Sequence, residues 1–174
     1  MAAIIEAPQT GEYAPYYEPY IRRVNSGDLL KYFSEQTEDL ASVCAPLSEE
    51  QMLYRYAPNK WSVKDVLGHI IDSERIFCYR ALTFARGDKY EIPGFEENEY
   101  AAIANMDARS KESLIEEFRS VRQATITLFN NFDPSVLRNI GTANKNPASV
   151  RAIGYVIAGH ELHHLSVVKE RYLK

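Results

Sequence analysis

The sequence has only two cysteines, Cys44 and Cys78, and they do not form a CxxC pair. This excludes a disulfide-rich scaffold and a cysteine-rich metal site, and we expect two buried thiols in a reducing compartment. No apolar run approaches the roughly 18 residues that would cross a bilayer, and no basic stretch followed by an apolar core stands at the N-terminus. These absences predict a cytoplasmic protein without a membrane partner.

An excess of positive charge is also missing. The chain carries 20 Lys and Arg against 24 Asp and Glu, for a formal net charge of -4, and the basic residues are scattered among the acidic ones. Such a distribution argues against binding to nucleic acid. The 174 residues, 45% of them hydrophobic, suffice for one sizeable core. We therefore expect a single domain that acts on a small-molecule substrate.

A convincing alternating strand pattern is absent too, whereas apolar residues recur at helical spacing in four stretches. Ser62 and Asp65 form a capping-box signature before the second stretch, with Trp61 placed to pack against Val66, and Gly87 is suited to end that helix. We predict an all-α, four-helix up-down bundle over residues 26–174, joined by longer links at 48–60, 87–108 and 134–148. Its helices are expected from an N-cap at Ser26 to Pro46, from Ser62 to about Arg86, from about Ser110 to Asp133, and from Val150 onward.

Residues 1–25 differ in composition from the rest of the chain. They hold four of the twelve tyrosines and three of the eight prolines, a proline density that cannot continue a helix. We predict an irregular N-terminal arm. An undocked arm with so many aromatic rings would expose much apolar surface, so we expect it to pack on its own domain.

Three of the four histidines lie in the apolar segment that ends the chain. His160 and His164 are four residues apart and point into the apolar arc of the fourth predicted helix. That spacing lets two imidazoles bind one metal ion, and two hydrogen-bonded core histidines are the alternative. His69 lies at the edge of the apolar arc of the second helix, while Glu74 falls inside that arc and is expected to pair with an Arg or a neighbouring helix.

The Trp61-Ser62 helix start with His69, the block from Gly159 to His164 and the loop 138–144 together resemble the DinB/YfiT-like superfamily. The similarity extends to the arm and covers nearly the whole chain. It implies a four-helix bundle, a homodimer, and a divalent ion such as nickel or zinc bound by His69, His160 and His164. His163 matches no ligand position of that pattern.

The resemblance also suggests a chemistry. Some relatives are transferases or isomerases that use low-molecular-weight thiols, which implies a thiol-dependent S-transferase. Three neutral imidazoles leave a position of the ion open, and a divalent ion lowers the pKa of a thiol or of water. A metal-dependent hydrolase with Glu161 as the base is the alternative, because His160-Glu161-x-x-His164 satisfies the HExxH pattern, although the third ligand usual for a zinc peptidase is missing downstream.

A non-catalytic metal-binding or stress protein is the third reading. In a catalytic site the open metal position should face a cavity roofed by the 87–108 link and by the arm. In a structural site a fourth protein ligand, such as His163 or Glu161, would close the ion off. The surroundings of the three histidines therefore distinguish the readings.

Overall fold

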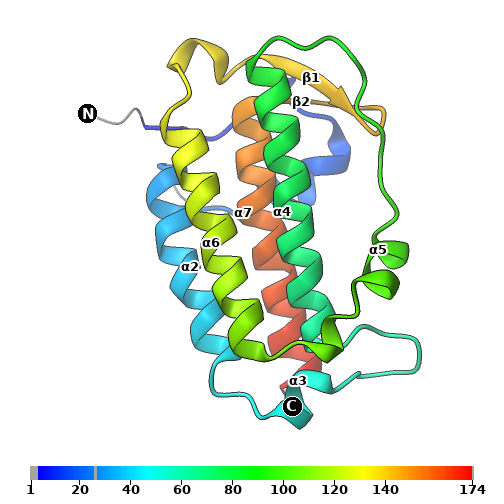
Figure 1. Ribbon diagram of the computed structural model, residues 1–174. Helices are drawn as coiled ribbons and strands as arrows, with labels where there is room; N and C mark the ends of the chain where they lie inside the picture. Colours follow the sequence, from blue (N-terminus) through cyan, green and yellow to red (C-terminus); the bar gives the residue numbers. More distant parts are fainter. Residues whose placement is uncertain (1–3, 26, 174) are drawn as a thin grey trace.

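The structure is a computed structural model that describes residues 4–25 and 27–173. Four long helices stand side by side and form the bundle (Figure 1). They are α2 (Leu29–Cys44), α4 (Val63–Ala85), α6 (Lys111–Asn130) and α7 (Val150–Val167), and a π-helical turn at Val168–Tyr172 extends the last one. The expected four-helix bundle is confirmed. Within the described part of the chain, no helix combines the length and the apolarity that crossing a bilayer requires.

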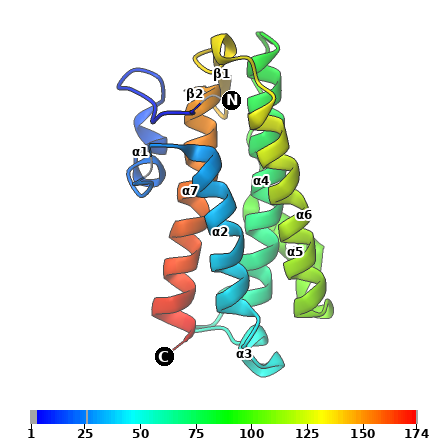
Figure 2. The same cartoon turned by 90° about the vertical axis from the view of Figure 1, so that its left-hand side faces the viewer.

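The order of the helices differs from the expected up-down arrangement. α2 and α7 run in one direction, and α4 and α6 run in the other (Figures 1 and 2). α4 packs against α6 and α7, and α2 packs against the same two helices, so α2 and α4 lie across the bundle from each other. The expected alternation is wrong because the link after α4 carries the chain back along the bundle before α6 begins.

Local capping signals set the helix starts. The Ser62 hydroxyl accepts a hydrogen bond from the Asp65 N–H at 3.0 Å, and the Asp65 carboxylate accepts one from the Ser62 N–H at 3.0 Å, which confirms the capping box. Gly87 follows α4 with a φ of +78°, as expected for a helix end. The predicted cap Ser26 lies outside the described residues, and Asp28 caps α2 by accepting from the Leu30 N–H at 3.2 Å.

Two links expected to be loops contain regular structure. The 87–108 link holds a short helix, α5 (Glu97–Ala104), and a 3₁₀ turn at Met106–Ala108. The 134–148 link holds an antiparallel hairpin, which was not predicted because each strand has only four residues. Asn144 and Lys145 turn it with φ values of 49° and 62°. The strands of this hairpin are β1 (Ile140–Ala143) and β2 (Asn146–Ser149). In the 48–60 link, the short helical turn predicted after Pro46 is α3 (Glu49–Leu53).

The N-terminal arm packs on α7, as expected, and most of its described residues have no regular structure. It forms a 3₁₀ turn at Pro15–Tyr17 and a short helix, α1 (Glu18–Ile21), with a proline in the first turn of each. Proline is tolerated there because the first helical N–H groups have no intrahelical acceptor, so the proline density of the arm still permits these two short turns. Ala14 N–H donates to the Pro147 carbonyl at 2.9 Å and so ties the arm to the hairpin.

Buried polar side chains separate the apolar core into two parts, one toward each end of the bundle. Four of the large ones, one on each long helix, are almost inaccessible to solvent. They are Gln36 on α2, Glu74 on α4, Arg122 on α6 and Glu161 on α7. We call these four residues the polar layer.

Candidate metal centre

Two neighbouring helices bring three histidines together. His69 lies in the second turn of α4, and His160 and His164 lie one turn apart on α7. The Nε2 atom of His160 is 3.0 Å from His69 Nε2 and 3.1 Å from His164 Nε2. Nitrogen ligands about 2.0–2.1 Å from a tetrahedral ion stand roughly 3.3 Å apart, which is close to these separations.

The two short contacts of His160 cannot both be ordinary hydrogen bonds. A neutral imidazole nitrogen carries either one proton or one lone pair, so His160 Nε2 can satisfy only one of its two neighbours. A cation placed among the three nitrogens satisfies all of them at once. The arrangement therefore fits a metal ion better than a hydrogen-bonded cluster.

The protonation of the three rings suits metal binding. Burial, aided by the neighbouring His163, lowers the pKa of His69 to about 4. Burial, with the charges of His69 and His163, lowers the pKa of His164 to about 3. His160 is only 6% exposed, and burial holds its pKa well below the usual value. All three imidazoles are thus neutral at neutral pH, which is the form that binds metal.

Aromatic rings surround the cluster and restrict the orientation of the imidazoles. The ring centroid of Trp61 lies 4.7 Å from that of His69. The centroids of Tyr20 and Phe77 lie 5.5 Å and 5.7 Å from that of His160. These contacts leave one side of the cluster facing a cavity.

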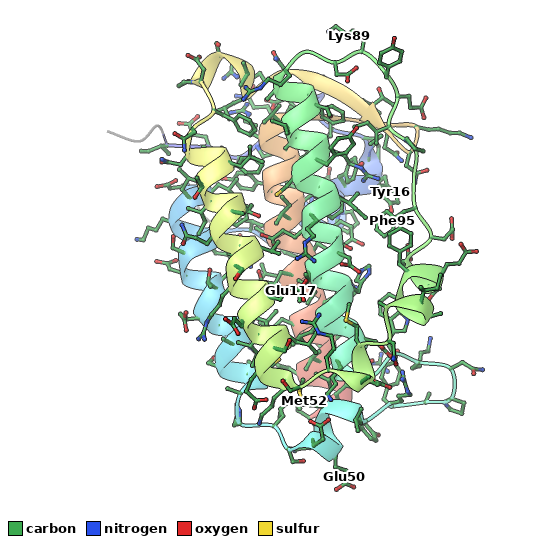
Figure 3. The ribbon with its side chains drawn as sticks, viewed as in Figure 1. Tyr16, Glu50, Met52, Lys89, Phe95 and Glu117 are labelled. Carbon is green, nitrogen blue, oxygen red and sulfur yellow. The ribbon has the colours of Figure 1, made fainter. Side chains whose placement is uncertain are left out.

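The cavity has a volume of about 390 Å³ and receives walls from the arm, the bundle, the 87–108 link and the hairpin. Figure 3 shows Tyr16 of the arm and Phe95 of the link beside α4 on the same side of the bundle, and both residues line the cavity. The roof expected for an open site is therefore present. The lining also includes Tyr17, Ser73, Arg80, Glu96, Glu97, Asn144 and His163.

Glu161 does not join the histidines. Its side chain is 1% exposed and accepts a hydrogen bond from Arg122 Nη2 at 2.6 Å. Burial raises the pKa of Glu161 to about 7, although Arg122 acts in the opposite direction. The role of Glu161 as a base stays a prediction, and its carboxylate is absent from the cavity wall among the described residues.

The other buried glutamate behaves as expected. Glu74 accepts hydrogen bonds from Arg122 Nε at 2.8 Å and Nη2 at 2.9 Å, so its predicted pairing with an arginine is confirmed. His163 lines the cavity, but in the described chain the group of side chains able to share one ion consists of His69, His160 and His164.

Sequence reasoning missed Arg80, a buried cation that lines the cavity. It follows His69 by eleven residues, close to three helical turns, so both side chains lie on the same face of α4. Ser73 and Phe77 occupy the turns between them and line the same cavity. Stepping along α4 from His69 at helical spacing would have found this row.

Comparison with known proteins agrees with the fold. The structure is similar to that of YfiT from Bacillus subtilis, with a TM-score of 0.68 and 13% sequence identity over 95% of this chain and 91% of that one. YfiT is described as a probable metal-dependent hydrolase with an unusual four-helix bundle topology. No curated protein matches the sequence. The family model of the DinB superfamily matches residues 32–168, and the chain therefore belongs to that superfamily.

Proposed function

We propose that this protein binds one divalent metal ion through His69, His160 and His164 and uses it to act on a small molecule. The observation that supports this most directly is the convergence of three neutral imidazole nitrogens beside a cavity. Three histidines with one open position are the pattern of catalytic zinc, and imidazole also suits nickel. When bound, the ion would supply the positive charge that lowers the pKa of a thiol or of water.

The reaction we favour is a thiol-dependent S-transfer. Glu161 is held by Arg122, and the acids that line the cavity, Glu96 and Glu97, are exposed to solvent. The described cavity wall thus offers no buried carboxylate to remove a proton from water. A thiol has a low enough pKa to ionise beside a cation without a protein base. Trp61, Phe77 and Tyr20 would keep water away from the sulfur atom.

Hydrolysis is the second candidate, and the fold similarity to YfiT, a probable metal-dependent hydrolase, favours it. In that reaction Glu161 would have to leave Arg122 before it could serve as a base. A purely structural metal site is less consistent with the cavity, because neither His163 nor Glu161 closes the cluster.

The first test measures metal content in protein purified without a histidine tag. We expect about one ion per chain in the wild type and less than about a tenth of that in His69→Ala or His160→Ala. His163→Ala is the matched control, since His163 adjoins the cluster without joining it, and it should keep its metal. A wild-type metal content in His69→Ala would show that α4 supplies no ligand and would contradict the proposal.

The second part of the test uses the cobalt-substituted protein and a small thiol. A shift of the visible absorption bands on addition of thiol would indicate an open position and favour S-transfer. Bands that do not respond to thiol would favour hydrolysis or a structural ion. The sole tryptophan, Trp61, adds an independent signal, because its fluorescence should change when an ion binds to His69 beside it.

A further inference from the structure

A buried arginine lines the cavity at some distance from the histidines. Arg80 on α4 is 4% exposed, and its guanidinium carbon lies 5.4 Å from the centroid of the Phe77 ring. The Phe77 centroid in turn lies 5.7 Å from that of His160, so the guanidinium is no more than about 11 Å from the His160 ring. One cavity therefore contains the three imidazoles and a cation.

Among the described residues, Arg80 lacks the carboxylate partner that other buried arginines have. Arg122 is paired with Glu74 and Glu161, and Arg151 is paired with Glu12. Among residues 4–25 and 27–173, no carboxylate forms an ion pair with Arg80, and its buried Nε has no hydrogen-bond partner. The fold supplies an acid to each of the other two buried arginines but leaves this guanidinium facing the cavity.

The groups near Arg80 do not neutralise it. Phe77 offers a cation–π contact, and the other neighbours, Tyr16 and Tyr17, bring phenols rather than carboxylates. Glu96 and Glu97 line the same cavity, but they are exposed and make no ion pair with Arg80. An arginine stays protonated in proteins, and a buried cation without a counter-charge is unfavourable unless a ligand provides that charge. The planar guanidinium is shaped to bind an oxyanion with two hydrogen bonds.

We propose that Arg80 binds an oxyanion group, a carboxylate or a phosphate, of the substrate whose reacting atom lies at the histidine cluster. Because that separation of the guanidinium from the His160 ring is an upper limit, the substrate is a small acid in which the two groups are separated by a chain of no more than about six atoms, each bond advancing roughly 1.3 Å. The Phe77 ring lies between the two ends, in contact with both the guanidinium and the His160 ring, which suits an apolar linker. That the reacting atom lies at the histidine cluster rests on the proposed function, whereas the binding of an oxyanion by Arg80 does not.

The test measures the binding of hexanoate, hexyl phosphate and uncharged hexanamide to the protein as purified, by calorimetry. We expect Arg80→Gln to weaken the binding of the preferred anion at least tenfold and to leave the binding of hexanamide unchanged. Arg86→Gln is the matched control, because Arg86 caps the same helix, is exposed and lies outside the cavity wall, so this variant should bind like the wild type. The tighter of the two anions identifies the oxyanion.

Two further variants keep the outcomes distinct. His69→Ala should still bind the anion, so a failure of the metal proposal would leave the anion result intact. Arg80→Lys keeps the charge but loses the planar guanidinium, and its affinity for the anion should fall between those of the wild type and Arg80→Gln.

A merely structural role for Arg80 predicts a lower melting temperature in Arg80→Gln, whereas removal of an unpaired buried charge predicts an equal or higher one. Wild-type anion affinity in folded Arg80→Gln, or wild-type protein that binds neither hexanoate nor hexyl phosphate more tightly than hexanamide, would overturn the proposal.

Discussion

Single residues determine how the polar layer is neutralised. Arg122 is inaccessible to solvent and holds two carboxylates, those of Glu74 and Glu161, while Thr125 donates a hydrogen bond to Glu74 at 2.6 Å. Because Glu161 is the neighbour of His160 in the chain, this ion pair anchors α7 at the turn that carries the histidines. The polar layer thus supports the cluster without contributing an atom to it.

The Arg122→Ala variant should destabilise the fold strongly. It leaves two carboxylates buried without a cation, and breaking a buried ion pair costs about 3–5 kcal/mol. Urea unfolding of the variant and the wild type measures the difference in the free energy of unfolding. Arg119→Ala on the same helix is the control, since Arg119 forms an exposed pair with Glu38 at 2.9 Å and should contribute less than about 1 kcal/mol. Equal effects of the two variants would show that the polar layer does not stabilise the fold.

At the scale of elements, the contact between the arm and α7 shapes one wall of the cavity. Gly159 lies so close to α1 that a Cβ atom there would be 2.0 Å from the Tyr20 carbonyl oxygen. Tyr20 contacts His160, the residue next to Gly159, at a ring distance of 5.5 Å. Only glycine allows this approach of the two backbones.

Substitution of Gly159→Ala should displace the arm. We expect a loss of about 1–3 kcal/mol in the free energy of unfolding, because backbone atoms must move to make room for the methyl group. Limited proteolysis should cut the arm faster, and thermal unfolding reports the loss of stability. Gly27→Ala is the control, because an added Cβ there meets no atom within 4 Å. Unchanged proteolysis of the arm in Gly159→Ala would mean that the arm tolerates the methyl group.

For the whole molecule, one carboxylate joins the arm, the hairpin and α7. Glu12 accepts hydrogen bonds from Arg151 Nε at 2.7 Å and from Ser149 Oγ at 2.8 Å. Burial alone would raise the pKa of Glu12, but the bonds from Arg151 and Ser149 outweigh it and lower the pKa to about 2. Since the pKa is lower in the folded state than in the unfolded state, this stabilisation is complete above pH 4.5 and disappears as the pH falls to about 2.

The Glu12→Gln variant should therefore be less stable than the wild type near neutral pH but nearly as stable as the wild type in acid. Above pH 5 we expect it to be less stable than the wild type by on the order of 2–3 kcal/mol, and the difference should shrink as the pH falls toward 2. Urea unfolding at pH 6 and at pH 3 measures both values. Glu50→Gln, an exposed site on α3, should show no such convergence. A stability difference that does not change with pH would contradict this link between the Glu12 pKa and stability.

The homodimer and the cytoplasmic location stay predictions.

Features with a local cause could be predicted from the sequence. The capping box at Ser62 depends on residues three apart, and the pairing of His160 with His164 depends on one helical turn. The resemblance to the DinB superfamily added His69, and the structure places all three histidines together. The longer apolar periodicities likewise predicted the four bundle helices.

The tertiary structure decided the rest, because helical periodicity tells which face of a helix is apolar but not which helix packs against it. The parallel course of α4 and α6 depends on the path of a long link. Glu161 pairs with Arg122 rather than facing the cavity because the long Arg122 side chain reaches across the bundle interior from α6, the helix diagonally opposite α7. Arg80 has no acidic partner for the converse reason: the described elements that surround it bring tyrosines, a phenylalanine and an open cavity, and no buried carboxylate.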